Sequence, residues 1–239
     1  MIIETDALAQ NDLKVKFPVE SVRDSDDIYH LMINGVTRKY RKKSIIYREG
    51  ERSVSIYYVI KGRVKTSKWN VDGKELITGL YKVKDFLGNS AIITFGRYEE
   101  TAEAMLDSEL AVISIPDFEK MLLQIPFLAN KLYSNQIVNM LDNQVRMMNI
   151  AYGTVRQKVI NALLTFMEKY NTGRDSNFEI DVSRHNLAAL AGVARESVIR
   201  TLSDLRDEGI IQIGESKIRI TCIKRLVLEC DFTKINSNR

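Results

Sequence analysis

Residues 181–221 constrain the fold more than any other part of the chain. Their sequence, DVSRHNLAALAGVARESVIRTLSDLRDEGIIQIGESKIRIT, predicts two short helices joined by a tight turn. Ser183 is a typical N-cap residue, since its hydroxyl can accept a hydrogen bond from a free N–H group of the first helical turn. Gly192 is expected to supply the turn. The helix before the turn has one apolar face, formed by Leu187, Leu190 and Ala191.

The second helix of this segment is expected to end at Gly209, because glycine commonly follows a helix C-terminus. A two-stranded wing is expected after it. The buried face of the second helix is formed by Val198, Leu202 and Leu205. Its exposed face begins with Arg195, Glu196 and Arg200.

These three exposed side chains suit the edges of DNA bases. An arginine can donate two hydrogen bonds to guanine, and a glutamate can accept one from the cytosine amino group. The alternative is an ordinary solvated charge pair, which is opposed by the position of Arg195 and Glu196 at the start of a second helix. Ile199 could contact a thymine methyl group or pack, and we expect packing. A solvated face is expected further along, at Arg206, Asp207 and Glu208.

Composition limits the class of protein without deciding it. The 239 residues suffice for one large or two modest domains, and the net charge of +4 permits nucleic-acid binding without arguing for it. No apolar run approaches bilayer length, so no membrane partner is expected. The N-terminus, MIIETDALAQND, lacks a signal-peptide pattern, which predicts a cytoplasmic protein. No Walker-type loop, nucleophile elbow or HExxH motif is present, so we predict no enzyme and no catalytic residue.

The cysteines and histidines predict no metal site. Cys222 and Cys230 are expected to be ordinary small residues near the end of the wing, without a structural disulfide. The two histidines, His30 and His185, are far apart in the sequence. We expect His185 to be a neighbour of a DNA phosphate rather than a metal ligand.

Short strands are expected over residues 37–114, after an N-terminal extension of residues 1–23 and a short helix over 24–34. β-rich runs such as SIIYREG and SIYYVIKG alternate with glycines, which favours an antiparallel sandwich or roll. Asp-Gly lies at the centre of the predicted hairpin turn over residues 71–74.

Helices are expected after Pro116: a short one over 117–123, a long one whose first turn holds Pro126, and a third over 155–170. Gly153, before the third helix, is a candidate hinge. The long helix could pack on its own domain or form a two-stranded coiled coil between subunits, which we favour because its apolar stripe is narrow. The stripe is formed by Val138, Leu141, Val145, Met148 and Tyr152.

These features together resemble the cyclic AMP receptor protein and fumarate–nitrate regulator (CRP/FNR) family of bacterial transcription regulators. The resemblance is strongest in LAALAGVARESVIRTLSDLRDEGII and is supported by YYVIKGRV, VDGKE and DFLGNSA. It implies an α+β fold with a cyclic-nucleotide-binding-like antiparallel β-roll, a double-stranded jelly roll. The implied domains are the β-roll sensor over 24–125, a dimerisation helix over 126–152 and a winged helix-turn-helix over 153–239.

The family resemblance implies a homodimer that reads a palindromic DNA site. Arg195, Glu196 and Arg200 would read bases of a GTGA-like half-site, and RNA polymerase would be a further partner. The residues that would contact DNA phosphates are Ser183, Arg184 and Lys217.

The same resemblance implies an effector pocket in the roll, and here the sequence departs from the cyclic AMP-binding pattern. Gly88 and Thr101 fit that pattern, but Asn89 stands where the family has a glutamate, and Glu100 stands where it has the arginine that pairs with the cyclic phosphate. Two negative charges at about 4 Å repel by about 4 kcal/mol at an effective dielectric constant of about 20. Cyclic AMP is therefore an unexpected effector.

Several alternatives stay open for the sensor. A register slip would place Arg97 at the phosphate. Asn143 and Gln144 on the long helix could contact a ligand or form interhelical hydrogen bonds. The chain could therefore be a cyclic-nucleotide-responsive regulator with a rearranged phosphate cassette, a regulator with an unknown small-molecule effector, or a ligand-sensing module that binds no DNA. We predict no cofactor, because the iron–sulfur cysteine cluster and clear haem ligands are missing.

Overall fold

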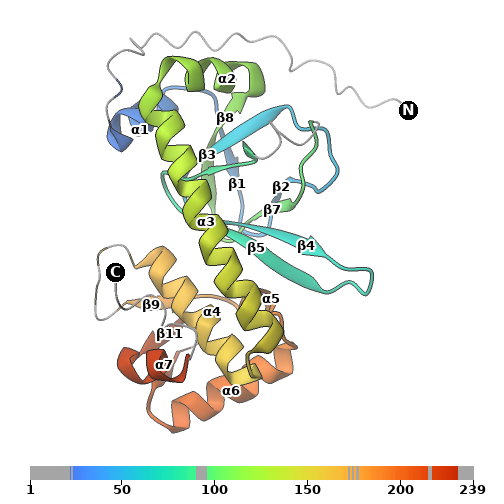
Figure 1. Cartoon of the computed structure of the whole chain (residues 1–239), viewed down its shortest axis with the longest axis vertical. Helices are drawn as coiled ribbons and strands as arrows, with labels where there is room; N and C mark the ends of the chain where they lie inside the picture. Colours follow the sequence, from blue (N-terminus) through green and yellow to red (C-terminus); the bar gives the residue numbers. More distant parts are fainter. Residues whose placement is uncertain are drawn as a thin grey trace. The chain divides into compact units, whose positions relative to one another are not determined.

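The computed structural model describes Val22 and residues 24–89, 96–171, 173, 175, 178–214 and 217–230 (Figure 1). The predicted extension over residues 1–23 lies outside the described residues, apart from Val22. The chain divides into two compact units. The first unit comprises Met1–Val64, Val83–Glu99 and Glu103–Tyr133, and the second comprises Lys65–Lys82, Glu100–Ala102 and Ser134–Arg239.

The first unit begins with helix α1 (Ser25–Ile33), which the sequence predicted. The Asp24 carboxylate caps this helix by accepting hydrogen bonds from the backbone N–H groups of Asp26 and Asp27 at 2.7 and 2.9 Å. Those hydrogen bonds hold the pKa of Asp24 below its usual range, since they favour the charged form. The backbone N–H of Asp24 in turn donates a hydrogen bond to the Asp27 carboxylate at 3.3 Å, which completes a capping box.

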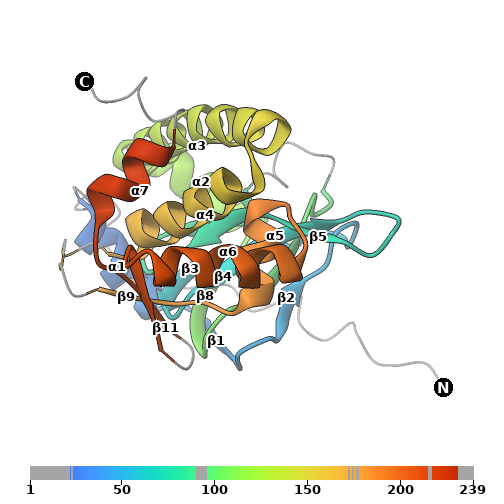
Figure 2. The ribbon, with the colours of Figure 1, turned by 90° about the horizontal axis from the view of Figure 1, so that it is seen from below.

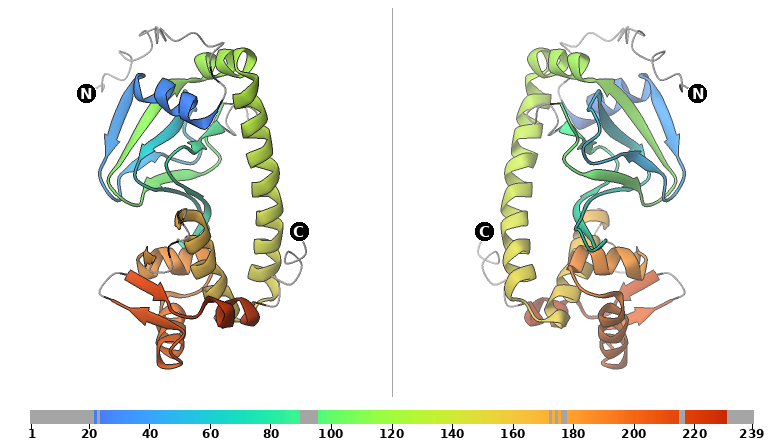
Figure 3. Two further views of the ribbon diagram at one scale, coloured as in Figure 1. Left: turned by 90° about the vertical axis from the view of Figure 1, so that its left-hand side faces the viewer. Right: turned by 90° about the vertical axis from the view of Figure 1, so that its right-hand side faces the viewer.

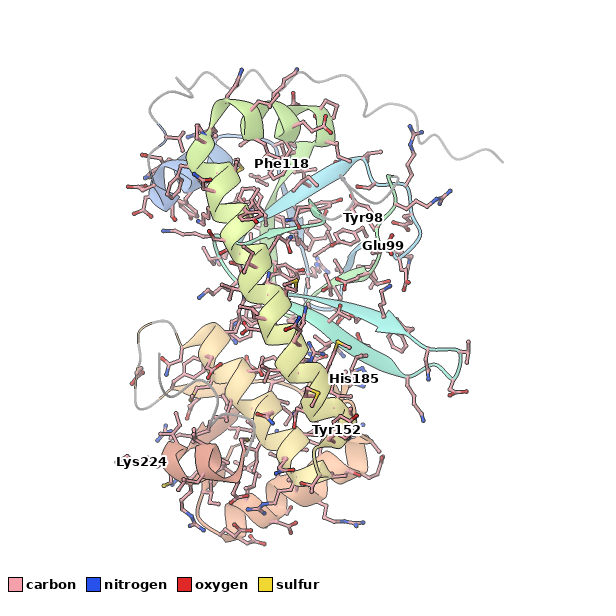
Figure 4. All side chains as sticks on the ribbon, in the orientation of Figure 1. Tyr98, Glu99, Phe118, Tyr152, His185 and Lys224 are labelled. Atoms are coloured by element: carbon pink, nitrogen blue, oxygen red, sulfur yellow. The ribbon has the colours of Figure 1, made fainter. Side chains whose placement is uncertain are left out.

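An antiparallel sheet with the strand order β1-β8-β3-β6 forms the centre of the first unit. Tyr58 lies opposite Ala111 in its longest pairing, between β3 and β8. The two residues belong to an apolar core that α1 and α2 (Ile115–Gln124) complete with Ile28 and Phe118, and Phe118 is labelled in Figure 4. The strands are β1 (Thr37–Tyr40), β3 (Ser55–Lys61), β6 (Phe86–Leu87) and β8 (Ser108–Ser114).

A second sheet has the strand order β2-β7-β4-β5. Its strands β4 and β5 form the predicted hairpin, in which Gly73 has a φ of +73° and the N–H of Asn70 donates to the carbonyl of Lys74 at 3.1 Å. The predicted antiparallel β-roll is therefore confirmed. The strands are β2 (Ile45–Tyr47), β4 (Val64–Trp69), β5 (Glu75–Tyr81) and β7 (Thr101–Ala104).

Helix α2 begins two residues before the predicted start, because Ser114 caps it and proline is tolerated in a first turn. Helix α3 (Pro126–Tyr152) follows as one continuous helix of 27 residues (Figure 3). Its start at Pro126 agrees with the prediction.

The C-terminal helices of the second unit pack on one another. Helices α4 (Val155–Tyr170), α5 (Arg184–Ala191) and α6 (Arg195–Asp207) are in mutual contact, as Figure 2 shows. Both helices of the predicted helix-turn-helix and the Val155–Tyr170 helix are confirmed. Among the described residues, no helix combines the length and apolar character needed to cross a bilayer.

The predicted two-stranded wing is confirmed, since β10 pairs with β11, but the sequence did not predict a third strand, β9 (Glu179–Asp181), which also pairs with β11. Ile180 of β9 and Ile218 of β11 lie opposite each other and are both buried, so the added strand covers an apolar side of the hairpin. The sequence also failed to predict α7 (Ile223–Glu229), a short helix that buries only Leu226. The wing strands themselves are β10 (Ile211–Ile213) and β11 (Lys217–Ile220).

The turn between β3 and β4 depends on Gly62, which has a φ of +95° and lies against the backbone of Asp107 and Ser108. A Cβ atom there would come within 2.7 Å of the carbonyl oxygen of Asp107. We expect Gly62→Ala to lower the free energy of unfolding by about 3 kcal/mol, since a positive φ costs alanine about 1 kcal/mol and the overlap adds about 1–3 kcal/mol. Urea denaturation measures this loss.

The matched control is Gly50→Ala. Gly50 also has a positive φ, +80°, but a Cβ atom there meets nothing within 4 Å, so the cost should be only about 1 kcal/mol. Equal losses for the two variants would contradict this explanation.

Candidate nucleic-acid interface

The helix-turn-helix is built by caps that lie close together in the sequence. The Ser183 hydroxyl accepts a hydrogen bond from the backbone N–H of Asn186 at 3.0 Å, which starts α5. Gly192 ends α5 with a left-handed φ of +65°, as the sequence predicted. Helix α6 begins three residues later, at Arg195, so its first turn directly follows the tight turn.

Burial of one face of α6 exposes the predicted base-reading residues on another. Val198, Leu202 and Leu205 are buried as predicted. Arg195, Glu196 and Arg200 are exposed, and within the described residues none of them forms a hydrogen bond or ion pair with another side chain. A helix with three such free polar side chains can present their donors and acceptors to a ligand.

The expectation that Ile199 packs is wrong, because its side chain is 46% exposed. It lies on the exposed side of α6 beside Arg200, where an apolar contact with a base methyl group is sterically open. The solvated face further along is correct for Arg206 and Asp207, which form an exposed ion pair at 2.8 Å.

Glu208 is exposed, as the sequence predicted, and its carboxylate also binds a basic side chain of the same unit. Arg156 on α4 donates two hydrogen bonds to the Glu208 carboxylate, at 2.8 and 2.7 Å, and a further one to Glu229 of α7 at 2.6 Å. The hydrogen bonds that Arg156 donates to Glu229 and Glu208 raise the pKa of its guanidinium. This network ties the ends of α6 and α7 to α4, which fixes α6 on the domain.

The predicted phosphate contacts are partly engaged within the chain. Ser183 serves as the N-cap of α5, and Arg184 is half-buried, which lowers the pKa of its guanidinium. The Lys217 ammonium lies 3.1 Å from the Glu179 carboxylate, which also binds Arg219 at 2.8 Å. Hydrogen bonds from Lys217 and Arg219 lower the pKa of Glu179.

His185 lies at the exposed end of α5, where Figure 4 labels it, and its Nε2 is 2.9 Å from Oε2 of Glu75 on β5. The same carboxylate accepts a hydrogen bond from Lys65 at 2.7 Å, and Lys65 also donates to the Asn186 side chain at 3.0 Å. Burial opposes ionisation of Glu75, but hydrogen bonds from Lys65, Ser67 and His185 outweigh it and lower the pKa. We call Lys65, Glu75, His185 and Asn186 the α5 anchor; sequence reasoning missed its two hairpin residues.

In the first unit, tyrosine rings fill the space beside Gly88, one of the candidate effector residues. Tyr47 and Tyr98 stack with ring centroids 3.8 Å apart, and the Tyr98 hydroxyl donates to the carbonyl of Ser55 at 2.7 Å. A Cβ atom on Gly88 would lie only 3.2 Å from the Tyr98 ring, which is labelled in Figure 4. The next residue, Asn89, is half-buried. Tyr47 also stacks on Tyr57, with ring centroids 5.6 Å apart. The runs SIIYREG and SIYYVIKG contain Tyr47 and Tyr57, but spacing alone does not predict the stacking.

In the second unit, the charge of Glu100 acts on Arg146 of the same chain. The half-buried Arg146, on α3, donates hydrogen bonds to the backbone carbonyls of Ile77 and Thr78 on β5. Burial lowers the pKa of Arg146, and the negative charge of Glu100 acts in the opposite direction. Thr101 is half-buried, and the other candidate effector residues of this unit, Asn143 and Gln144, are exposed on α3.

The Arg97 side chain donates a hydrogen bond to the carbonyl of Gly50 at 2.6 Å. The Arg97 guanidinium therefore already binds the backbone. This contact argues against the alternative register, in which Arg97 would bind a ligand phosphate.

The five stripe residues of α3 are exposed, so the chain's own described residues do not cover them. Their exposed fractions are 54% for Val138, 48% for Leu141, 42% for Val145, 50% for Met148 and 75% for Tyr152, which Figure 4 labels. After α3, a Cβ atom on Gly153 would lie 2.5 Å from Oδ1 of Asn149. The predicted hinge therefore needs glycine for a close approach rather than for an unusual φ.

The cysteines flank α7, with Cys230 buried and Cys222 half-buried, and neither forms a disulfide. In the described ranges, no three His, Cys, Asp or Glu side chains come together in a way that could hold a metal ion.

The roll, the long helix with an apolar stripe, and the exposed recognition face of α6 define a class: a sensor domain joined to a DNA-binding winged helix-turn-helix. Residues 37–124 match the family described as "Cyclic nucleotide-binding domain", and residues 157–228 match "Crp-like helix-turn-helix domain".

Relatives are similar to this chain over most of their length. The "cAMP-activated global transcriptional regulator CRP" of Pasteurella multocida (strain Pm70) is 30% identical over 177 residues, which cover 72% of this chain and 84% of the relative. The "Anaerobic regulatory protein" of Bacillus subtilis (strain 168) is 29% identical over 219 residues, 90% of this chain and 92% of the relative. The structure of FixK2 from Bradyrhizobium japonicum has the same fold, with a TM-score of 0.71, 23% identity, and coverage of 81% of this chain and 96% of that one.

The chain therefore belongs to the CRP/FNR family of DNA-binding transcription regulators. The relatives named above are regulators rather than enzymes.

The contribution of the Ser183 N-cap to stability can be tested by substitution. Ser183→Ala should lower the free energy of unfolding by about 1 kcal/mol, because the N–H of Asn186 loses its acceptor. Ser183→Asp keeps an acceptor at the same position and should stay close to wild type. Thermal denaturation of both variants measures the difference, and an alanine variant as stable as wild type would contradict the capping role.

Proposed function

We propose that this CRP/FNR-family regulator binds, as a homodimer, a palindromic DNA site with GTGA-like half-sites. The observation that carries the proposal is the exposed polar face of α6, where Arg195, Glu196 and Arg200 have no protein partner among the described residues. Arginine donors match guanine, and a glutamate acceptor matches cytosine. Ser183, Arg184 and Lys217 are the proposed phosphate contacts, which set register and affinity rather than sequence.

The proposed dimer interface is the stripe on α3. Five apolar side chains at alternating spacings of three and four residues, each at least 42% exposed, are typical of a helix that forms a coiled coil with a second copy. A two-fold dimer would present two copies of α6 to half-sites about one helical turn apart. RNA polymerase is the proposed further partner. The proposed location is the cytoplasm, where a bacterial regulator has access to the chromosome.

The proposed sensor responds to something other than cyclic AMP. Glu100 would bring a negative charge to the cyclic phosphate, and Arg146 already supplies that carboxylate with a positive field. The stacked Tyr47 and Tyr98 rings occupy space beside Gly88. The proposed effector is an unidentified small molecule, with no iron–sulfur cluster and no haem.

The second candidate is a cyclic-nucleotide-responsive regulator with a rearranged phosphate cassette. The match of residues 37–124 to a cyclic nucleotide-binding domain favours it. A sensing module that binds no DNA is disfavoured by the free polar face of α6.

The base-reading assignment is tested by Arg195→Ala. The variant should bind a GTGA-type palindrome about 10–100-fold more weakly, the loss of about 1–3 kcal/mol from one bidentate base contact. Its affinity for unrelated DNA should change little. Fluorescence anisotropy with labelled duplexes measures both constants.

The control for this variant is Arg206→Ala, which removes the same charge from the same helix. The Arg206 guanidinium already binds the Asp207 carboxylate at 2.9 Å, so its loss should change site affinity less than threefold. Undiminished, sequence-specific binding by Arg195→Ala would show that this arginine does not read a base.

The dimer is tested by Leu141→Glu, which places a charge in the centre of the stripe. The wild-type chain should sediment at twice its mass of 27.4 kDa, and the variant should be monomeric, because an interface must desolvate the new carboxylate. The control, Asn139→Glu, adds a charge to an exposed position outside the stripe and should remain dimeric. A variant Leu141→Glu as dimeric as wild type would contradict this interface.

The sensor proposal is tested by calorimetry with cyclic AMP. The wild-type protein should show no binding tighter than about 1 mM, since charge repulsion of about 4 kcal/mol weakens affinity roughly a thousandfold. Glu100→Arg, which reverses the charge, should bind at least tenfold more tightly than wild type. Micromolar binding by the wild-type protein would favour the second candidate instead.

A further inference from the structure

A small polar cavity lies where the C-terminal end of α3 meets α4 and α5. Its volume is about 20 Å³, and its lining includes Arg146 and Asn149 of α3, Lys158 and Asn161 of α4, and Leu190 of α5. All of these residues belong to the second compact unit. One water molecule needs about 10–15 Å³, so the cavity suits a particle of roughly that size.

Three of the lining residues each carry a side-chain polar atom that solvent does not reach and that has no hydrogen-bond partner. These atoms are Nε of Arg146, Oδ1 of Asn149 and Nδ2 of Asn161. The Asn149 residue as a whole is only 5% exposed. Buried polar groups of folded proteins almost always form hydrogen bonds, and an unpaired one is destabilising. Three such atoms on the residues of one cavity favour a small ligand that bonds to them.

The charge of the lining selects the kind of ligand. Arg146 and Lys158 are cationic, and none of the lining residues is acidic. The Arg146 guanidinium donates hydrogen bonds to two backbone carbonyls of β5. The charge of Glu100 acts on it, but none of the described carboxylates forms an ion pair with it. A charge removed from solvent is stabilised by an opposite charge, which an anion supplies and a water molecule does not.

We propose that this cavity is a binding site for a small monovalent anion such as a halide. The Nε–H group of Arg146 and the Nδ2–H group of Asn161 donate hydrogen bonds to the anion. A half-turn of the Asn149 amide exchanges its oxygen for its NH₂ group, which adds a third donor. The bound anion joins the end of α3 to α4 and thereby stabilises the second unit. None of the lining residues is a proposed DNA contact, so the site does not depend on the proposed function.

The first test compares the thermal stability of the full chain in potassium chloride and in potassium gluconate at equal ionic strength. Gluconate is too large for the cavity, so only chloride can bind there. We expect the melting temperature to be about 3 °C higher in chloride at about 0.5 M, the effect of a roughly tenfold shift in the unfolding equilibrium of a chain of this size.

The variant Asn161→Asp removes one donor and adds a carboxylate to the lining. We expect its melting temperature to be the same in the two salts, because the new carboxylate supplies the negative charge and repels an anion. The matched control, Asn139→Asp, makes the same substitution at an exposed position of α3 outside the cavity. This control should keep the wild-type response to chloride.

Crystals of the wild-type protein grown in sodium bromide locate the anion without any substitution. We expect an anomalous bromide peak within hydrogen-bonding distance of Arg146 Nε and Asn161 Nδ2. Equal melting temperatures of the wild-type protein in the two salts, with only water density in the cavity, would overturn the proposed site. A chloride response that persists in a folded Asn161→Asp variant would also overturn it, because the anion would then bind elsewhere.

Discussion

Burial of one face of α6 is the constraint on which the proposed DNA contacts depend. Because Val198, Leu202 and Leu205 pack against the domain, the orientation of α6 about its own axis is fixed, and this orientation determines which of its residues are exposed to solvent. The helical period then places Arg195, Glu196 and Arg200 on the exposed side. These three side chains can contact a ligand only because the packing of α6 holds them on the exposed side. The hydrogen bonds of Arg156 to Glu208, at the end of α6, stabilise this packing.

Several carboxylates of the second unit bind basic side chains of the same unit. Glu75, Glu179 and Glu208 each bind cationic or imidazole side chains of the C-terminal helices and wing. One of these carboxylates, Glu179, binds Lys217, which is a proposed phosphate contact. A DNA phosphate that binds Lys217 would therefore replace an internal carboxylate rather than meet a free cation, which lowers the net gain from that contact.

The sequence predicted the parts of the fold that depend on neighbouring residues. The cap at Ser183, the turn at Gly192 and the apolar stripe of α3 are all local patterns, and each helix that they define is present. Strand β9 and helix α7 were missed because each is short and buries little: α7 buries only Leu226.

The α5 anchor was missed for a different reason. His185 and Glu75 are 110 residues apart, and no sequence pattern predicts that a hairpin of the roll contacts the first turn of α5. The same limit applies to Tyr47 and Tyr98, whose stacking comes from the way the roll closes. Ile199 was misplaced because its apolar character suggests burial, whereas the helical period exposes it.

The central claim is that two copies of α6 read one DNA site together, and the spacing of the half-sites tests it most directly. Anisotropy titrations should compare a GTGA-type palindrome whose half-sites lie one helical turn apart with the same palindrome lengthened by about 5 base pairs, half a turn. A symmetric dimer should bind the lengthened site at least tenfold more weakly, because its second α6 then faces the wrong side of the duplex. Equal affinity for both sites, and for a single half-site, would contradict the account.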